Sequence, residues 1–382
     1  MTRPGRERDE PVGRRVARWR VRRRMTQQML ADRLGKSKSW VDKVERGVRN
    51  LDRYSVVQEI ARVLRLDPAE LLDPRRPPPP SSAATTLDGV DAVRAALAHY
   101  HQRPARAVPA DEVGRHVTHA WLTYQHAHYA HLLRALPALL DAAHATASLL
   151  APAYRITASV LVKLGEADLA WLAADRAVAA ATGDPIRTGA ATIAVAQALR
   201  ALGRDRLALT AAVAAAGTAA DDGVRGTLLL QAAMAAAGCG DGRRAGDLID
   251  HAAALADRRA GTDDSHHTAF GPATVRLGRF VSALYVGDAA QAVCLHEEAV
   301  RRDDWRRLPA EHRAAHLIDA ARAYRQAGDL TAAGRALAEA DTIAPAEVRY
   351  RPAARTLIAE IAHSGHAAAS VARLAALVGL TR

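Results

Sequence analysis

The fold of the N-terminal part is decided by residues 25–49, which read MTQQMLADRLGKSKSWVDKVERGVR. Thr26 is a favourable cap for the start of a helix, and Gly35 is a favourable end. Ser37 and Gly47 bound a second short helix in the same way. Apolar residues recur at helical spacing, so one face of each helix is expected to be buried. The residues predicted to point inward are Met29, Leu30, Leu34, Val41 and Val44.

Two short helices joined by a tight turn are typical of a helix-turn-helix, whose second helix enters the major groove of DNA. Three motifs in this region are Thr26-Gln27, Leu30-Ala31 and Glu45-Arg46-Gly47. In these motifs, residues 12–72 resemble the Cro/repressor (Xre) family. The resemblance implies that Arg20 and Glu45 form a structural ion pair inside the domain.

The same resemblance implies which residues contact DNA. Lys38, Ser39 and Lys43 are expected to face base edges, and Gln27 is expected to hold a phosphate. Trp40 stands where the family has small polar residues, so it packs either on the DNA or on the domain's own surface. The full set expected to contact double-stranded DNA is Gln27, Lys36, Ser37, Lys38, Ser39, Trp40, Lys43, Arg46, Arg49 and Asn50.

The charge distribution also favours a nucleic-acid partner. Residues 1–80 hold 21 Lys and Arg against 11 Asp and Glu, which is +10 of the chain's net charge of +12. Such asymmetry points to a polyanion bound by the N-terminal part, the alternative being a solvated charged surface. The N-terminus is charged throughout and no apolar run reaches the length of a bilayer, so we expect a cytoplasmic protein with no membrane partner.

A proline run marks the domain boundary. Four consecutive prolines at 77–80 cannot continue a helix and favour an extended spacer. The predicted divisions are a basic tail at 1–11, a DNA-binding domain at 12–74, a linker at 75–87 and a helical domain at 88–382.

The second domain contains an internal repeat. Five glycines recur at spacings of 38, 37, 47 and 41 residues, and each is followed by Ala at both five and twelve positions. Gly permits a tight turn between two helices, and Ala lets those helices approach closely. The glycines are Gly165, Gly203, Gly240, Gly287 and Gly328, with a weaker sixth unit at Gly365.

The last full unit, residues 321–345, resembles the tetratricopeptide repeat. Residues 111–147 are expected to add one or two helix pairs that lack the glycine. Aromatic residues make up only 4% of the chain, which favours closely packed helices over sheets. The prediction is therefore an all-α protein, with a five-helix helix-turn-helix domain followed by a tetratricopeptide-like α-solenoid.

The repeat register predicts a cationic concave groove. Such a groove would suit an anionic small molecule or a peptide as effector, or it would be the docking surface of a partner protein. The alternative is that the arginines pair with carboxylates of neighbouring helices. The chain has a single Asn, at position 50, whereas peptide sensors of this layout grip peptides with rows of Asn. The residues expected to bind the ligand are Arg155, Lys163, Gln197, Arg200, Tyr285, Arg322, Arg325 and Arg355.

Other candidate features carry less weight. A polar insertion at 257–271 either covers the binding face or is a simple connector. His312 and His316 have helical spacing for a metal, but no third ligand is evident, so no metal or cofactor is expected. Cys239 and Cys294 are interpreted as buried structural thiols. No Walker loop, Gly-x-Ser-x-Gly elbow or dinucleotide glycine pattern occurs, so an enzyme is not expected.

The sequence thus predicts a cytoplasmic, sequence-specific transcription regulator. Its N-terminal domain reads an operator, and its helical domain senses a ligand, binds a partner or forms a homodimer. The alternative is a protein-interaction scaffold that is anchored to DNA and recruits a partner through the solenoid.

Overall fold

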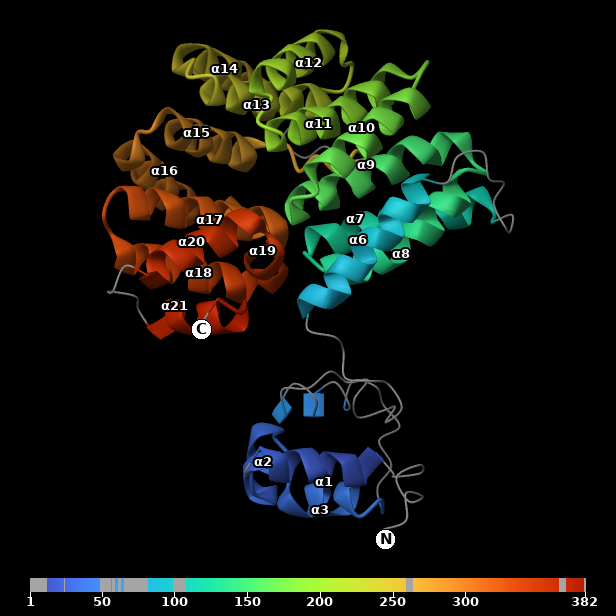
Figure 1. The fold of residues 1–382 in the computed structure, drawn as a ribbon, viewed down its shortest axis with the longest axis vertical. Helices are drawn as coiled ribbons and strands as arrows, with labels where there is room; N and C mark the ends of the chain where they lie inside the picture. Colours follow the sequence, from blue (N-terminus) through green and yellow to red (C-terminus); the bar gives the residue numbers. More distant parts are fainter. Residues whose placement is uncertain are drawn as a thin grey trace. The chain divides into compact units, whose positions relative to one another are not determined.

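The computed structural model describes residues 12–23, 25–48, 82–98, 108–258, 264–363 and 369–380, together with positions 56, 59, 60, 63 and 64. The chain divides into two compact units, Met1–Thr85 and Thr86–Arg382 (Figure 1). Throughout these described ranges the regular elements are helices and no strand occurs, which confirms the predicted all-α class.

The N-terminal unit contains α1 (Val12–Arg22), α2 (Gln27–Arg33) and α3 (Lys38–Glu45). Both predicted caps are formed, because the hydroxyls of Thr26 and Ser37 each accept a backbone N–H three residues later at 3.1 Å. Gly35 and Gly47 follow the two helices with φ of +59° and +74°, a conformation that favours glycine. The two further expected helices fall at 49–74, where only the five positions named above are described, and all five are helical.

The core of this unit agrees with the prediction at four of five positions. Leu30, Leu34, Val41 and Val44 are buried, whereas Met29 is 42% exposed. The buried face of α2 runs through residues 30, 31 and 34, which leaves position 29 at its solvent edge. The remaining core side chains of the cluster are Val16, Met25, Ala31, Ile60 and Leu64.

The second unit is a succession of helices, most of which pack as antiparallel pairs (Figure 1). The segment predicted to hold one or two helix pairs at 111–147 forms one pair. The described helices are α6 (Ser82–Ala98), α7 (Ala110–Gln125), α8 (Tyr129–Ala143), α9 (Ala147–Leu164), α10 (Ala167–Ala180), α11 (Pro185–Ala201), α12 (Asp205–Thr218), α13 (Asp222–Gly238), α14 (Gly242–Arg258), α15 (Pro272–Val286), α16 (Ala289–Arg301), the 3-10 helix η1 (Asp303–Arg307), α17 (Ala310–Gln326), α18 (Leu330–Ile343), α19 (Pro345–Tyr350), α20 (Pro352–His363) and α21 (Ala369–Leu377).

The glycine and alanine repeat has the structural role that its spacing predicts. All five glycines have φ between +68° and +93°, and each lies in the turn between the two helices of a pair. The alanines five residues later are fully buried, which allows the close helix contact. Of the alanines twelve residues later, only Ala215 is partly exposed. The weaker unit at Gly365 lies outside the described residues.

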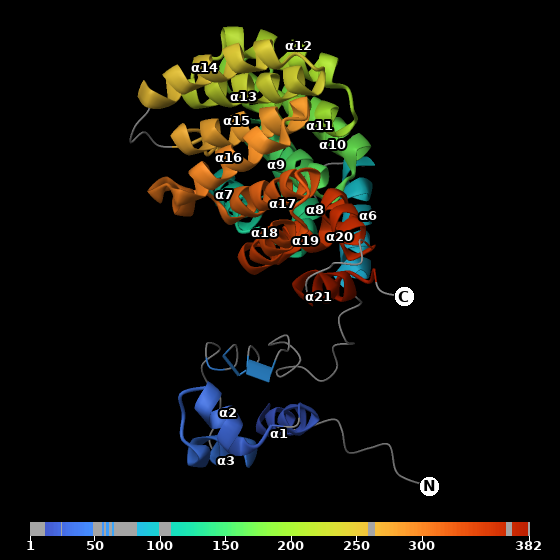
Figure 2. The ribbon, with the colours of Figure 1, turned by 90° about the vertical axis from the view of Figure 1, so that its left-hand side faces the viewer.

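The last helices pack against the first ones. Helices α17 and α19 contact α7 and α9 (Figure 2), and one hydrophobic core contains side chains of α6–α11 together with side chains of α17–α21. The second unit therefore closes on itself around its concave side. Nothing in the repeat pattern predicts this closure.

Three expectations differ from the structure. Helix α6 already begins at Ser82, inside the segment assigned to the linker. Cys239 and Cys294 are exposed thiols and not buried ones, the first in the turn that follows α13 and the second on α16. Helix α9 has the length and composition of a membrane span, with a mean hydropathy of 1.2, contrary to the prediction that no run is long enough. However, 61% of that helix is buried in the helical unit, as befits a core helix.

Candidate nucleic-acid interface and central pocket

The exposed surface at the start of α3 is the candidate DNA-binding surface. Lys38, Ser39 and Lys43 are exposed there, while Val41 and Val44 anchor the opposite face of the helix in the core. The side chain of Lys36 and that of Ser37 are also exposed. Arg46 pairs with Asp42 at 2.6 Å on the surface. The remaining predicted positions, Arg49 and Asn50, lie outside the described residues.

Glu45 organises the inner side of this unit. Arg20 donates to both of its carboxylate oxygens, from Nε at 2.6 Å and from Nη2 at 2.9 Å. This hydrogen bonding raises the pKa of Arg20. Gln27 donates its amide nitrogen to Glu45 Oε2 at 2.9 Å, so this nitrogen is held inside the domain in the present structure. For Trp40 the two alternatives were packing on the DNA or on the domain's own surface. Its side chain is half-buried and packs against the core of the domain.

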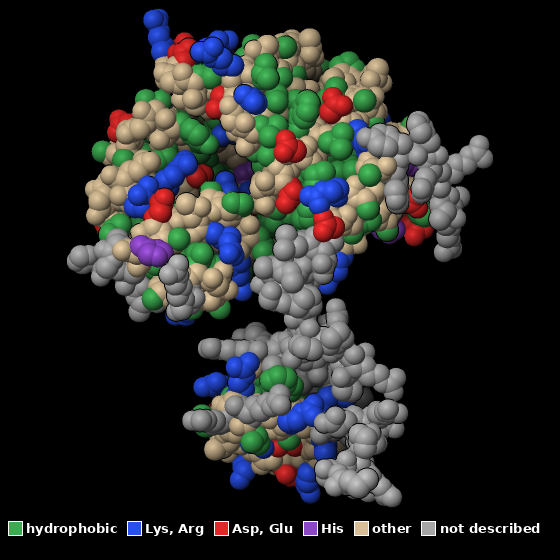
Figure 3. Space-filling view, in the orientation of Figure 1, with side chains coloured by type: hydrophobic (Ala, Val, Ile, Leu, Met, Phe, Trp, Pro, Cys, Tyr) green, Lys and Arg blue, Asp and Glu red, His purple; other side chains and the backbone are tan. Residues whose placement is uncertain are grey.

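The helical unit contains a central pocket of about 250 Å³ on its concave side. Figure 3 shows the hollow, with histidine inside and Lys and Arg side chains along its edge. Its walls come from α7, α9, α11, α13, α15 and α17, which are the inner helices of successive pairs. The insertion contributes His267 and Thr268, so it does cover part of this face.

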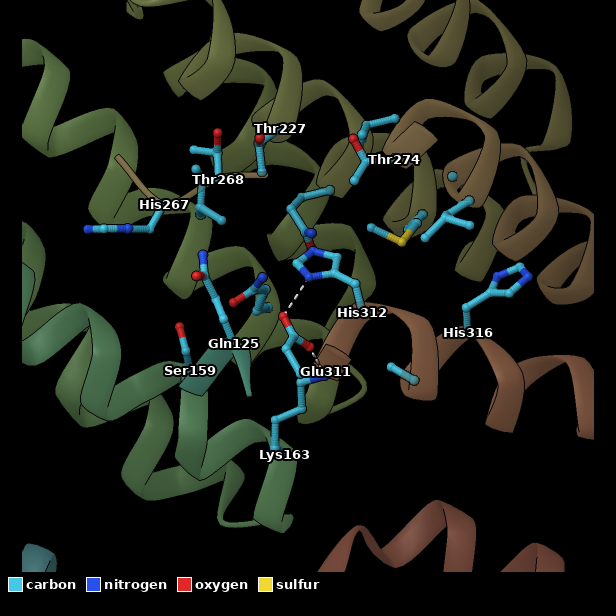
Figure 4. Close-up of a pocket in the computed structure, with 18 of the residues that line it drawn as sticks. Gln125, Ser159, Lys163, Thr227, His267, Thr268, Thr274, Glu311, His312 and His316 are labelled. Atoms are coloured by element: carbon cyan, nitrogen blue, oxygen red, sulfur yellow. Dashed lines mark hydrogen bonds and ion pairs between the residues drawn. The ribbon is translucent and has the colours of Figure 1, made fainter. Parts of the chain in front are cut away.

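One end of the pocket holds a buried network of charges. Lys163 Nζ lies 2.7 Å from Glu311 Oε2 and 2.8 Å from Glu347 Oε1, and Glu311 Oε1 lies 2.7 Å from His312 Nδ1 (Figure 4). Tyr129 donates its hydroxyl to Glu347. Burial opposes the charge of Lys163, but the two carboxylates outweigh it and raise its pKa. Burial likewise opposes the charge of Glu311, whose pKa is nevertheless lowered by His312 and Lys163.

Arg155 lies in another part of the pocket wall and is only 7% exposed. Its guanidinium carbon is 4.5 Å from the ring centroid of Trp121, and its Nη2 donates to the carbonyl of His267 over a long 3.4 Å. The imidazole of His267 stacks on Trp121 at 5.2 Å. Burial lowers the pKa of Arg155 to about 10, although the charge of Asp264 opposes this effect. Within the described residues, Arg155 forms no ion pair with a carboxylate.

A second cationic group lies beside the pocket. Arg200 and Arg322 approach the ring of Tyr285, with guanidinium carbons 5.7 Å and 5.4 Å from its centroid. Arg200 also donates to Gln231 at 3.1 Å, and Gln231 lines the pocket. Arg322 is 3.6 Å from Asp319.

These contacts bear on the prediction of a cationic groove, for which pairing with neighbouring carboxylates was the alternative. The pairing alternative holds for Lys163, for Arg322 and for Arg325, which is 3.2 Å from Glu360. Arg355 is turned to the backbone carbonyl of Arg349. Of the eight predicted ligand residues, those that line the central pocket are Arg155, Lys163 and Gln197.

Comparison with known proteins relates the chain to a domain family and to a solved structure. Residues 11–73 match a family described as a helix-turn-helix domain. No curated protein matches the chain. The crystal structure of Bacillus thuringiensis PlcR in complex with the peptide PapR7 and DNA is similar over 88% of this chain and 95% of that chain, with 10% identity and a TM-score of 0.41. The chain thus carries a helix-turn-helix DNA-binding domain together with a domain of helical repeats.

Several residues of the pocket were missed from the sequence. Helix α7 has no repeat glycine, so the register did not reach Trp121 and Gln125, which line the pocket. Glu311 stands at the start of α17, where an acidic residue is ordinary, and only the fold brings it to Lys163.

The helical spacing of His312 and His316 does not place the two side chains in one site. His312 lies beside Glu311, whereas His316 Nε2 is 2.9 Å from His296 Nδ1, so the two histidines at i and i+4 serve different contacts. No group of three or more metal-ligating side chains occurs in the described part of the chain.

Proposed function

We propose that this protein is a sequence-specific transcription regulator of the Xre type, which acts in the cytoplasm as a homodimer on double-stranded DNA. The observation that carries the proposal is the exposed polar surface formed by Lys38, Ser39 and Lys43 at the start of α3, within a region that matches a helix-turn-helix domain. Side chains at this position of a recognition helix reach base edges in the major groove. Lysine donates to O6 and N7 of guanine, so guanine is expected in each half-site.

The test is selection of bound sequences from random duplex DNA, followed by affinity measurements on the selected site. A recurring motif with two half-sites about one or two helical turns apart supports the proposal. Lys38→Ala should weaken binding to that site by about 1–3 kcal/mol and leave binding to unrelated DNA nearly unchanged. The control is Arg206→Ala, which removes an exposed charge from the helical unit. Equal loss on both DNA sequences would mean that Lys38 contacts phosphate.

The helical unit is proposed to sense an effector. The central pocket supports this role over that of a DNA-anchored scaffold, because a scaffold needs an accessible surface and not a pocket walled by six helices and a loop. The scaffold would instead bind DNA without sequence preference and retain a protein partner through purification.

A further inference from the structure

Among the charged side chains that line the central pocket, one cation makes no direct ion pair with a carboxylate of the described residues. The Lys, Arg, Asp and Glu side chains that line the pocket are Arg155, Lys163, Glu311 and Asp319. Lys163 pairs with Glu311, and Asp319 lies next to Arg322. Arg155 is therefore the charged side chain of the lining that has no direct ion pair among the described residues, and it is buried, with an exposed fraction of 7%.

Asp264 acts on Arg155 through its charge, but the oxygens of this carboxylate are already engaged. Its Oδ1 accepts from the backbone and the hydroxyl of Thr268, both at 2.8 Å, and its Oδ2 accepts from the backbone of Ala269 at 2.7 Å. These bonds hold the loop in which His267 and Ala269 have positive φ of 49° and 50°. Asp264 thus fixes the loop that covers the pocket and leaves the hydrogen-bonding capacity of Arg155 to another group.

A buried guanidinium with so few partners is costly unless an anion joins it. Its direct contacts here are the Trp121 ring and one long hydrogen bond to the carbonyl of His267, and the charge of Asp264 acts on it without forming an ion pair. Arginine has five N–H donors in a planar arrangement that matches the two oxygens of a carboxylate. The geometry is therefore suited to receive a carboxylate at Arg155.

The rest of the wall is largely apolar on the side of α11, α13 and α15. The pocket residues there include Ile193, Leu230, Met234, Leu277 and Val281. Such a surface binds hydrocarbon by removing it from water. A ligand that satisfies both parts of the pocket has an acidic group at one end and an apolar body.

The closed shape of the unit argues against an extended peptide. A peptide in a solenoid groove lies along the inner helices of successive repeats, but here α17 contacts α7 and the loop at 264–271 covers part of the same face. The space that remains is about 250 Å³. It suits a compact molecule that is enclosed between the inner helices.

We propose that the central pocket binds a small organic acid whose carboxylate pairs with Arg155 and whose apolar body lies against Leu230, Met234 and Leu277. The inference rests on the proposed function only in naming this acid as the effector. The site itself is defined by the helical unit and does not depend on DNA binding.

The test compares three six-carbon molecules of similar size whose head groups differ in charge: the anion hexanoate, the neutral hexanamide and the cation hexylammonium. A fourth probe, 4-phenylbutanoate, has a larger apolar body. Binding to the full chain is measured by calorimetry and by the shift of the melting temperature at constant ionic strength. We expect both acids to bind, with hexanoate at least about tenfold tighter than hexanamide, and hexylammonium not to bind.

Variants of the pocket complete the design. Arg155→Met should abolish the preference for the acid over the amide, Arg155→Lys should retain part of it, and the control Arg206→Met should leave it unchanged. The proposal is overturned if neither acid binds, if amide and acid bind equally, or if the preference survives in Arg155→Met. If an acid binds without any effect on operator affinity, the regulatory role is refuted and the binding site is kept. If the protein binds its operator but no acid, the binding site is refuted and the DNA-binding function is kept.

Discussion

At the scale of single residues, the clearest determinant of the N-terminal fold is Glu45. Its side chain is 6% exposed and accepts three hydrogen bonds, two of them from Arg20. Glu45→Ala leaves the guanidinium without its partner, so we expect a loss of about 3 kcal/mol or more in the free energy of unfolding of this unit. Urea denaturation of the full chain, followed by Trp fluorescence and amide exchange in α1–α3, measures the loss.

The neighbouring pair of Asp42 and Arg46 provides the control for that experiment. It has the same charges and the same 2.6 Å separation, but its side chains are 37% and 63% exposed. Asp42→Ala should therefore cost less than about 1 kcal/mol. Equal effects of the two substitutions would contradict a structural role for Glu45.

Two buried histidines make the stability of the helical unit depend on pH. Burial lowers the pKa of His296 to about 4 and that of His316 well below its ordinary value. In the unfolded chain both titrate near 6.5, so below that pH the unfolded state binds more protons and stability falls. For His296 the fall runs from about pH 6.5 to about pH 4, at up to about 1.4 kcal/mol per pH unit. His316 adds to the fall below about pH 6.5, and stability above pH 6.5 is unaffected by either group.

Melting temperatures between pH 7.5 and pH 4.5 check this expectation. His296→Gln keeps a side chain that can hydrogen-bond to His316 but removes one titrating group, so the slope should become shallower. His363→Gln, at an exposed position, should keep the full slope. An unchanged slope in His296→Gln would assign the acid sensitivity to other groups.

At the scale of elements, the repeat glycines set the turns between paired helices. Gly240 has φ of +82° and open space around it, so a methyl group there strains the backbone without a clash. Gly246 lies within α14, also with open space, and its substitution adds helix propensity. Gly240→Ala should destabilise the unit by about 1 kcal/mol, and Gly246→Ala should stabilise it by up to about 1 kcal/mol. Urea denaturation of both variants decides the sign, and a gain in both would refute the turn requirement.

The features that could be predicted from the sequence are those set by local contacts. A glycine with positive φ and a buried alanine five residues later both follow from the geometry of one helix pair, so their spacing reveals the repeats. The caps of α2 and α3 are local in the same way. The pocket is different, because its walls come from six helices and a loop. Lys163 is 148 positions from Glu311, and Tyr129 is 218 positions from Glu347, so no pattern along the chain links them.

At the scale of the helical unit as a whole, this charge network joins the first repeats to the last. Lys163 belongs to α9, Glu311 to α17 and Glu347 to α19, and both carboxylates are almost inaccessible, at 4% and 0% exposure. The same contact also forms one end of the central pocket. Closure of the solenoid and the shape of the pocket therefore depend on the same ions.

Removal of Lys163 should loosen both ends of the unit together. Lys163→Met leaves two buried carboxylates close to each other without their shared cation, and loss of one partner of a buried pair costs about 3–5 kcal/mol. Because the lost contact spans α9, α17 and α19, amide exchange should accelerate in all three helices, while α12–α14, which have their own core, change least. Arg325→Met is the matched control, since it breaks the half-exposed pair with Glu360 inside the last repeats and should cost less than about 1 kcal/mol. Faster exchange confined to α9, or spread evenly over every helix, would show that Lys163 does not hold the closure.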